Sequence, residues 1–126
     1  MTSTKPKKYC IQFHKASHDH YDLRLELDNV AKSWALPKEP PSKEGIKRLA
    51  IQVNDHDISY MDFEGVIPEG SYGAGSVKIW DTGTWDPESV KDNKIVAIIN
   101  GKKLKGRYTL VKMKGNNWLF FKSKEK

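Results

Sequence analysis

The stretch of residues 21–27 limits what this chain can fold into more than any other part of it. Apolar and polar residues alternate strictly along it, which is the period-2 pattern of a β-strand with one buried face. The apolar set, expected to face a core, is Tyr21, Leu23, Leu25 and Leu27. The polar set, expected on the other face, is His20, Asp22, Arg24 and Glu26. Residues of one face follow each other at about 6.6 Å, so the polar set forms a close row of functional groups.

That polar row has the chemistry of a binding site. An imidazole, a carboxylate and a guanidinium at successive positions suit metal and phosphate ligands, whereas a solvated face usually carries Thr, Ser, Lys or Glu. His14 and His18 lie just before the row. A hydrogen-bonded surface pair of His20 and Asp22 is the plainer alternative, and Arg24 two residues later counts against it.

The rest of the chain reads as short strands separated by turns. The expected strands are 9–14, 30–36, 48–54, 76–80, 94–99, 107–113 and 118–121. The expected turns are 28–29, 81–83, 100–101 and 114–117, with a Pro-rich loop at 37–47. No stretch shows helical periodicity over three turns. Short strands with this punctuation predict an all-β protein, a compact antiparallel β-barrel with long loops and at most short helical turns, with a sandwich as the alternative.

Two local features sharpen this picture. The apolar residues change parity at 54–55, which predicts a bulge or bend that places His56 and Tyr60 beside a distortion. The glycine-rich segment 67–75 invites a phosphate-loop interpretation, but it lacks a terminal Gly-Lys-Ser/Thr and no helix pattern follows it. The four tryptophans are expected in the core, with an aromatic platform for stacking bases as the alternative.

Length and composition indicate one domain over residues 1–126, with residues 1–8 flexible. No apolar run approaches the roughly 20 residues that span a bilayer, and no leader opens the chain, so we expect a cytoplasmic protein without a membrane partner. Cys10 is the only cysteine, so no internal disulfide can form, and it is expected to be buried.

Positive charge is concentrated at one end of the chain. Residues 101–126 contain nine Lys or Arg side chains and a single Glu, whereas the formal net charge of the whole chain is +6. A polyanion such as nucleic acid is the ordinary partner for such an excess. A solubilising lysine tail is the alternative.

The candidate site combines a metal cluster with phosphate-binding groups. His14, His20 and Asp22 can converge on one ion, and Mn²⁺, Zn²⁺ or Fe²⁺ would all fit. Arg24 and Arg48 offer planar donors for phosphate oxygens. With His56 as a proton donor to the leaving oxygen, the set suggests phosphoester hydrolysis.

Five blocks in order carry a resemblance to a known family. They are residues 12–27 (Gln-x-His-x5-His-Tyr-Asp-Leu-Arg-Leu-Glu-Leu), 32–38 (Lys-Ser-Trp-Ala-Leu-Pro-Lys), 47–50 (Lys-Arg-Leu-Ala), 55–60 (Asp-His-x3-Tyr) and 63–75 (Phe-Glu-Gly-Val-Ile-Pro-Glu-Gly-x-Tyr-Gly-Ala-Gly). Residues 103–113 add a hairpin of the same kind. The chain resembles the 3′-phosphoesterase domain of bacterial DNA ligase D, here as a stand-alone version with a short N-terminal arm.

The resemblance implies a manganese-dependent nuclease of non-homologous end joining, with Zn²⁺ or Co²⁺ as other possible ions. It removes a 3′-terminal ribonucleoside and then a 3′-phosphate from DNA or RNA-tipped ends, leaving a 3′-hydroxyl for a separate ligase and polymerase. The metal ligands it implies are His14, His20 and Asp22. The phosphate-contacting and catalytic residues it implies are Arg24, Arg48, His56 and Tyr60, with Gln12 and Lys38 as further substrate contacts. Glu26 matches a further family position, and His18 could compete as a metal ligand.

Two rival functions remain open at this point. A mononuclear iron oxygenase would use His20, Asp22 and His56 as its metal ligands, but it requires neither Arg24 nor the basic C-terminal region. A non-catalytic barrel that binds single-stranded nucleic acid would use basic and aromatic side chains, but it leaves the row of His20, Asp22 and Arg24 unexplained.

Overall fold

A computed structural model describes residues 6–71 and 74–124. Its strands are β1 (Lys7–Lys15), β2 (His20–Leu27), β3 (Val30–Leu36), β4 (Lys47–His56), β5 (Gly65–Ile67), β6 (Gly75–Lys91), β7 (Lys94–Gly101), β8 (Lys105–Lys114) and β9 (Asn117–Lys122). A short 3₁₀ helix, η1 (Ile58–Asp62), follows β4. Within the described residues, no helix is long and apolar enough to cross a membrane.

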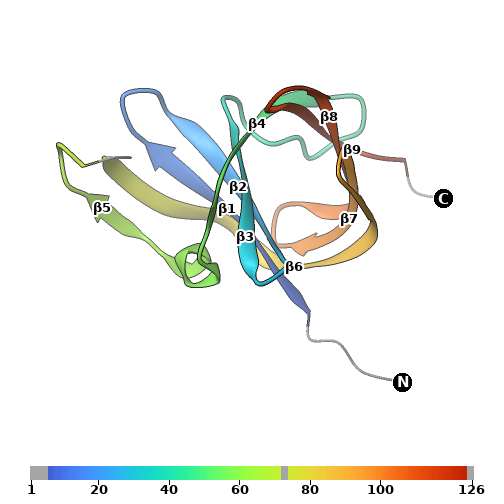
Figure 1. Cartoon of the computed structure of the whole chain (residues 1–126), viewed down its shortest axis with the longest axis horizontal. Coiled ribbons are helices and arrows are strands. Elements are labelled where there is room, and N and C mark those ends of the chain that lie inside the picture. The colour runs from blue at the N-terminus through green and yellow to red at the C-terminus, as the bar shows by residue number, and fades with distance from the viewer. Residues whose placement is uncertain (1–5, 72–73, 125–126) are drawn as a thin grey trace.

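Eight of these strands close into an antiparallel barrel (Figure 1). Their order around the barrel is β1, β2, β3, β4, β9, β8, β7 and β6, and pairing of β6 with β1 completes the ring. The remaining strand, β5, pairs with the first residues of β6 and lies outside the ring. The all-β barrel predicted from the alternation of short strands is therefore confirmed.

The barrel interior holds the alternating apolar residues of β1 to β3 together with aromatic side chains from the later strands. Trp34, Trp85 and Trp118 are all buried there, and Trp34 meets Trp118 edge-on at 5.6 Å between ring centroids. Trp80 is only partly buried. Core packing is thus confirmed for three of the four tryptophans.

Local sequence signals predicted the β2–β3 turn and the bulge in β4. Asp28 and Asn29 both have positive φ, 54° and 66°, as a two-residue type I′ hairpin requires. In β4, His56 pairs with Ala31 and Val53 with Ser33, so two residues of β4 oppose one of β3. The two residues that oppose Lys32 are the predicted pair 54–55, and His56, which follows them, contacts Arg24 of β2.

Two other predicted turns are wrong. Residues 81–83 lie inside β6, because the Asp81 carboxylate is buried and hydrogen-bonded there instead of capping a turn. Residues 100–101 extend β7, and the chain reverses at 102–104, where the three backbone N–H groups donate to Asp81. Lys7 and Lys8 already belong to β1, and residues 1–5 lie outside the described part of the chain.

The site occupies the outer face of β1, β2 and β3. Side chains of one parity on these strands fill the barrel, so those of the other parity point outward, where η1 and the residues after it cover them. Cys10, Ala31 and Met61 form a small second core beneath this cover, with Ile58 beside it. Cys10 is buried as predicted, and burial raises the pKa of its thiol to about 12.

Candidate active site

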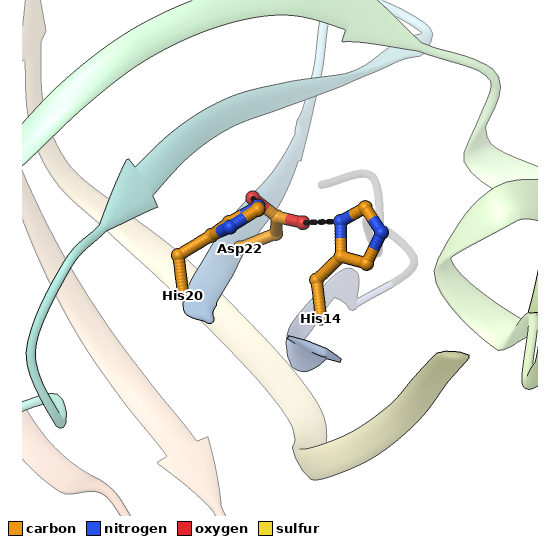
Figure 2. A group of neighbouring side chains, drawn as sticks. All are labelled: His14, His20 and Asp22. Carbon is orange, nitrogen blue, oxygen red and sulfur yellow. Dashed lines mark ion pairs between the residues drawn. The ribbon is translucent and has the colours of Figure 1, made fainter. Parts of the chain in front are cut away.

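His14, His20 and Asp22 lie together at the ends of β1 and β2 (Figure 2). His14 pairs directly with His20 across the two strands, and Asp22 follows His20 on the same face. One ligand atom from each residue lies within 4.8 Å of the others. His20 Nε2 is 3.2 Å from one Asp22 carboxylate oxygen, and His14 Nδ1 is 3.7 Å from the other.

The donor set of this cluster fits a divalent transition metal. Two imidazole nitrogens and one carboxylate oxygen suit Mn²⁺, Zn²⁺ or Fe²⁺, and three protein ligands leave coordination positions for water and substrate. A hydrogen bond to Asp22 raises the pKa of His20, opposed by burial and aided by a contact with the His18 carbonyl, 3.0 Å from His20 Nδ1. That contact orients the His20 ring from its other nitrogen, as outer partners of metal ligands commonly do.

Arg24 is the buried centre of the second half of the site. Its Nε donates to Gln12 Oε1 at 2.5 Å and its Nη1 donates to Ser33 Oγ at 2.6 Å. Its Nη2 lies 3.6 Å from Asp22 Oδ2, which joins it electrostatically to the cluster. Burial lowers the pKa of Arg24, and the negative charge of Asp22 opposes that shift. An arginine remains protonated in proteins, so a fixed positive charge sits beside the candidate metal site.

His56 and Tyr60 both contact Arg24 and complete this half of the site. Arg24 Nη1 is 3.1 Å from His56 Nδ1, and the Arg24 guanidinium carbon lies 4.9 Å from the centre of the Tyr60 ring. The His56 and Tyr60 rings are 5.0 Å apart. Burial, followed by the charge of Arg24, lowers the pKa of His56, and burial raises the pKa of Tyr60. His56 is therefore neutral at pH 7, and Tyr60 is a protonated phenol.

Gln12 ties these groups to the segment that covers them. Its side-chain amide donates to the backbone oxygens of Tyr60 at 2.8 Å and of Phe63 at 3.1 Å, while its amide oxygen accepts from Arg24. Gln12 is completely buried and does not line the pocket. Gln12 therefore holds Arg24 and the Tyr60 backbone in position through these buried hydrogen bonds.

One pocket of about 600 Å³ brings most of the predicted site residues together. His14, His18, His20, Asp22, Arg24, His56 and Tyr60 are among the residues that line it. Apolar side chains of Ala35, Val53 and Ile67 form another part of its wall. Sequence reasoning missed these apolar residues and also missed Ser33, which is completely buried under Arg24.

Besides Gln12, three predicted residues lie outside this pocket lining. Arg48 stands eight residues before His56, about 26 Å along an extended strand, and its Nε donates to the Glu39 carbonyl at 2.8 Å. Lys38 is exposed in the loop after β3. The Glu26 carboxylate accepts from the Lys8 backbone N–H at 2.8 Å, near the opposite end of β2 from His20. None of these three lines the pocket that contains the candidate metal cluster.

A histidine and aspartate cluster that could hold a metal ion lies beside a buried arginine on the outer face of a small closed barrel, and this combination defines a class of protein with a candidate site for a metal next to an anion. A model of the family described as the DNA Ligase D 3′-phosphoesterase domain matches residues 12–112. The chain therefore belongs to the DNA ligase D 3′-phosphoesterase domain family. The resemblance inferred from the five sequence blocks is confirmed.

Curated relatives agree with this assignment. The chain is 46% identical over 132 residues to the multifunctional non-homologous end joining protein LigD of Pseudomonas aeruginosa, covering 98% of this chain and 16% of that protein. It is 44% identical over 115 residues to the corresponding DNA repair protein of Mycobacterium tuberculosis, covering 88% of this chain and 15% of the relative. The chain thus spans about one sixth of the length of the relatives it matches.

Proposed function

We propose that this chain is a metal-dependent phosphoesterase that heals 3′ ends of DNA or RNA-tipped DNA. It removes a 3′-terminal ribonucleoside and a 3′-phosphate and leaves a 3′-hydroxyl for end joining. The observation that carries the proposal is the junction of two half-sites in one pocket, with Arg24 Nη2 only 3.6 Å from the Asp22 carboxylate. A phosphate bound there would meet a metal on one side and a guanidinium on the other.

His14, His20 and Asp22 are the residues that would hold the ion. Bound Mn²⁺, Zn²⁺ or Co²⁺ would supply Lewis-acid polarisation of the phosphoryl group and activation of water. Manganese is the proposed ion because the family resemblance implies it.

Arg24 is proposed to neutralise negative charge that develops on the phosphoryl oxygens. Its Nε and Nη1 hydrogen bonds to Gln12 and Ser33 hold the guanidinium in place before substrate arrives, so little reorganisation accompanies the reaction. Arg48 and Lys38 lie outside the pocket lining, and we propose them as contacts to more distant phosphates of the substrate.

His56 is proposed to protonate the leaving oxygen. While Arg24 donates to Nδ1, the ring proton of neutral His56 resides on Nε2. A bound phosphate brings negative charge that offsets the positive charge of Arg24, and this favours a protonated imidazole when the reaction needs an acid. Tyr60 packs against both residues and presents a phenol to the same pocket.

The geometry agrees less well with the two rival functions, the iron oxygenase and the nucleic-acid-binding barrel. The histidine grouped with His20 and Asp22 is His14, whereas His56 faces Arg24, so the ligand set expected of an iron oxygenase is not the one that converges. A purely nucleic-acid-binding barrel has no need of a buried arginine joined to an imidazole and a carboxylate.

The test is an assay on an oligonucleotide that carries a 3′-phosphate, with Mn²⁺ and with a chelator. The proposal expects inorganic phosphate and a 3′-hydroxyl product only when the metal is present. Binding without product would favour the binding barrel, and turnover that needs iron and an organic co-substrate would favour the oxygenase. Either result overturns the proposal.

A further inference from the structure

The inward-facing side of the strands that carry the candidate metal cluster continues past the barrel core to the strand ends, where it holds partly exposed aromatic and exposed basic side chains. Phe13 pairs directly with Tyr21 of β2 and with Lys78 of β6, and directly paired residues share one face of an antiparallel sheet. Lys15 lies two residues beyond Phe13 on this face. Trp80 is the unpaired residue of a bulge in β6, and its edge-on contact with Tyr21 places its ring on the same face. His14 and His20 alternate with these residues and so point to the other face.

The three aromatic rings form a continuous, partly exposed surface. The ring centroids of Phe13 and Tyr21 are 5.0 Å apart, and Tyr21 meets Trp80 edge-on at 5.6 Å. Lys103 reaches across from the β7–β8 turn, with its Nζ 4.3 Å from the centre of the Trp80 ring. We call Phe13, Tyr21, Trp80, Lys15, Lys78 and Lys103 the aromatic–lysine face.

A buried carboxylate fixes the turn that supplies Lys103. Asp81 accepts the backbone N–H groups of Lys102 at 2.8 Å, Lys103 at 2.9 Å and Leu104 at 3.0 Å, and the Tyr9 hydroxyl at 2.8 Å. Four donors converge on one carboxylate that is 3% exposed. The backbone that carries Lys103 is therefore held beside Trp80 instead of being free to drift, which lowers the entropic cost of using this cation in binding.

Charge on this face is unevenly distributed. Lys15, Lys78 and Lys103 are exposed around Phe13 and Trp80. Near Tyr21 the balance is opposite: burial, followed by the charges of Glu39 and Asp19, raises the pKa of the Tyr21 phenol. A polyanion is thus attracted to the β6 side of the face and repelled from the side next to β3.

We propose that the aromatic–lysine face binds an unpaired nucleic-acid strand, with bases stacked on Trp80 and Tyr21 and phosphates near Lys78 and Lys103. Aromatic rings interleaved with lysines are the usual means of holding single strands without regard to sequence. This inference rests on the proposed function, because the strand is the unpaired part of a substrate whose 3′ end reaches the pocket on the other face of the same two strands. Lys103 belongs to the positively charged region 101–126, so this proposal gives one charge of that region a specific role in binding.

Trp80 supplies a direct readout of this binding. The other three tryptophans, Trp34, Trp85 and Trp118, are at most 3% exposed, so quenching of tryptophan emission by an added oligonucleotide reports on Trp80. The probe is a 12-nucleotide single strand with a 3′-hydroxyl, which is a product and makes the result independent of hydrolysis. We expect quenching in the full chain and its disappearance in Trp80→Phe, which keeps a stacking ring but removes the indole.

The affinities of variants for this strand distinguish the contribution of base stacking from that of charge. Trp80→Ala should weaken binding of the 12-nucleotide strand by about 5- to 150-fold, the value of one lost base stack, whereas Trp80→Phe should lose little. The double variant Lys78→Gln/Lys103→Gln should lower the slope of log affinity against log salt by up to about 1.4, because each phosphate contact on a single strand contributes about 0.7.

The matched control removes two exposed lysines from the other side of the barrel. Lys94 and Lys124 border a groove of about 480 Å³ on β7, β8 and β9, and Lys94→Gln/Lys124→Gln changes the net charge by the same amount. The control should keep the wild-type salt slope. Equal decreases of the salt slope in the two double variants would show only an effect of net charge. If the oligonucleotide does not quench Trp80 emission, the strand does not bind to this face. Either result overturns the inference. Absence of phosphatase activity would instead overturn the proposed function and leave these binding results intact.

Discussion

Arg24 Nη1 lies 3.1 Å from His56 Nδ1, and this contact decides which nitrogen of His56 carries the proton. A guanidinium only donates hydrogen bonds, so Nδ1 must accept and Nε2 must hold the proton of the neutral ring. The Asn54 carbonyl lies 3.1 Å from the same Nδ1 and accepts from it only when Nδ1 is protonated, which removes the lone pair that takes the hydrogen bond from Arg24. The positive charge of Arg24, which is proposed to bind the phosphate, therefore also influences the protonation of His56, the proposed general acid.

The first prediction follows from this link. Burial and the Arg24 charge place the pKa of His56 below its ordinary value of about 6.5. Arg24→Gln removes a positive neighbour, which favours the protonated ring, so the pKa of His56 should rise. An NMR titration of the His56 ring proton measures the shift, and Lys94→Gln, which removes an exposed charge on β7, should leave the value unchanged. A pKa that does not rise in Arg24→Gln would contradict the coupling.

The second prediction concerns Ser33 as a positioning residue. Its buried hydroxyl accepts from Arg24 Nη1 and donates to the Ala31 carbonyl. Ser33→Ala leaves a charged donor short of a partner and should lower the free energy of unfolding by about 1–3 kcal/mol. It should also lower turnover by up to about 100-fold, because a displaced guanidinium no longer meets the phosphoryl oxygens.

Ser123→Ala is the matched control for Ser33. The Ser123 hydroxyl is also buried and shares a 2.5 Å hydrogen bond with the Thr109 hydroxyl on the β8–β9 side of the barrel. It should cost about 1 kcal/mol of stability in urea denaturation and leave turnover at the wild-type level. If both serine variants lose stability but neither loses turnover, Ser33 is only a structural residue.

The third prediction tests the metal ligands. His14→Ala and Asp22→Ala should each abolish hydrolysis and weaken Mn²⁺ binding, measured by electron paramagnetic resonance of the free ion, with unchanged far-UV circular dichroism. The fold should persist because both side chains project from the outer face of the barrel and not into its core. His18→Ala is the informative comparison, since His18 lines the pocket but lies outside the three-residue cluster. Near wild-type turnover in either ligand variant would refute the assignment.

Much of the fold was predictable because local patterns agree with the final structure. Strict alternation in β2, the turn at Asp28 and Asn29, and the parity change before His56 each depend on a few neighbouring residues. The turns predicted at 81–83 and 100–101 fail for the opposite reason. Asp81 has turn chemistry by itself, but four donors from distant segments satisfy its carboxylate in the interior, and no local pattern contains that information.

The site was predictable where its residues share one strand pair. His14, His20, Asp22 and Arg24 follow from alternation on β1 and β2. Ser33 was missed although a signal existed: the two-residue turn at 28–29 sets the register of β2 against β3 and thereby pairs Ser33 with Arg24. Arg48 was grouped with His56 because both lie on β4, but the length of that strand separates them.

The last prediction divides the work between His56 and Arg24. A sugar alkoxide is a poor leaving group that needs a proton, whereas a nitrophenolate hardly needs one. If His56 is the general acid, His56→Ala should lose far more rate on a 3′-ribonucleoside diester than on an aryl phosphate. Arg24→Ala removes charge stabilisation that both substrates need, so its losses on the two should be alike. Measuring kcat/KM for both variants on both substrates gives the comparison. Equal losses for His56→Ala would make it a phosphate ligand, and the leaving-group proton would then come from Tyr60 or from solvent.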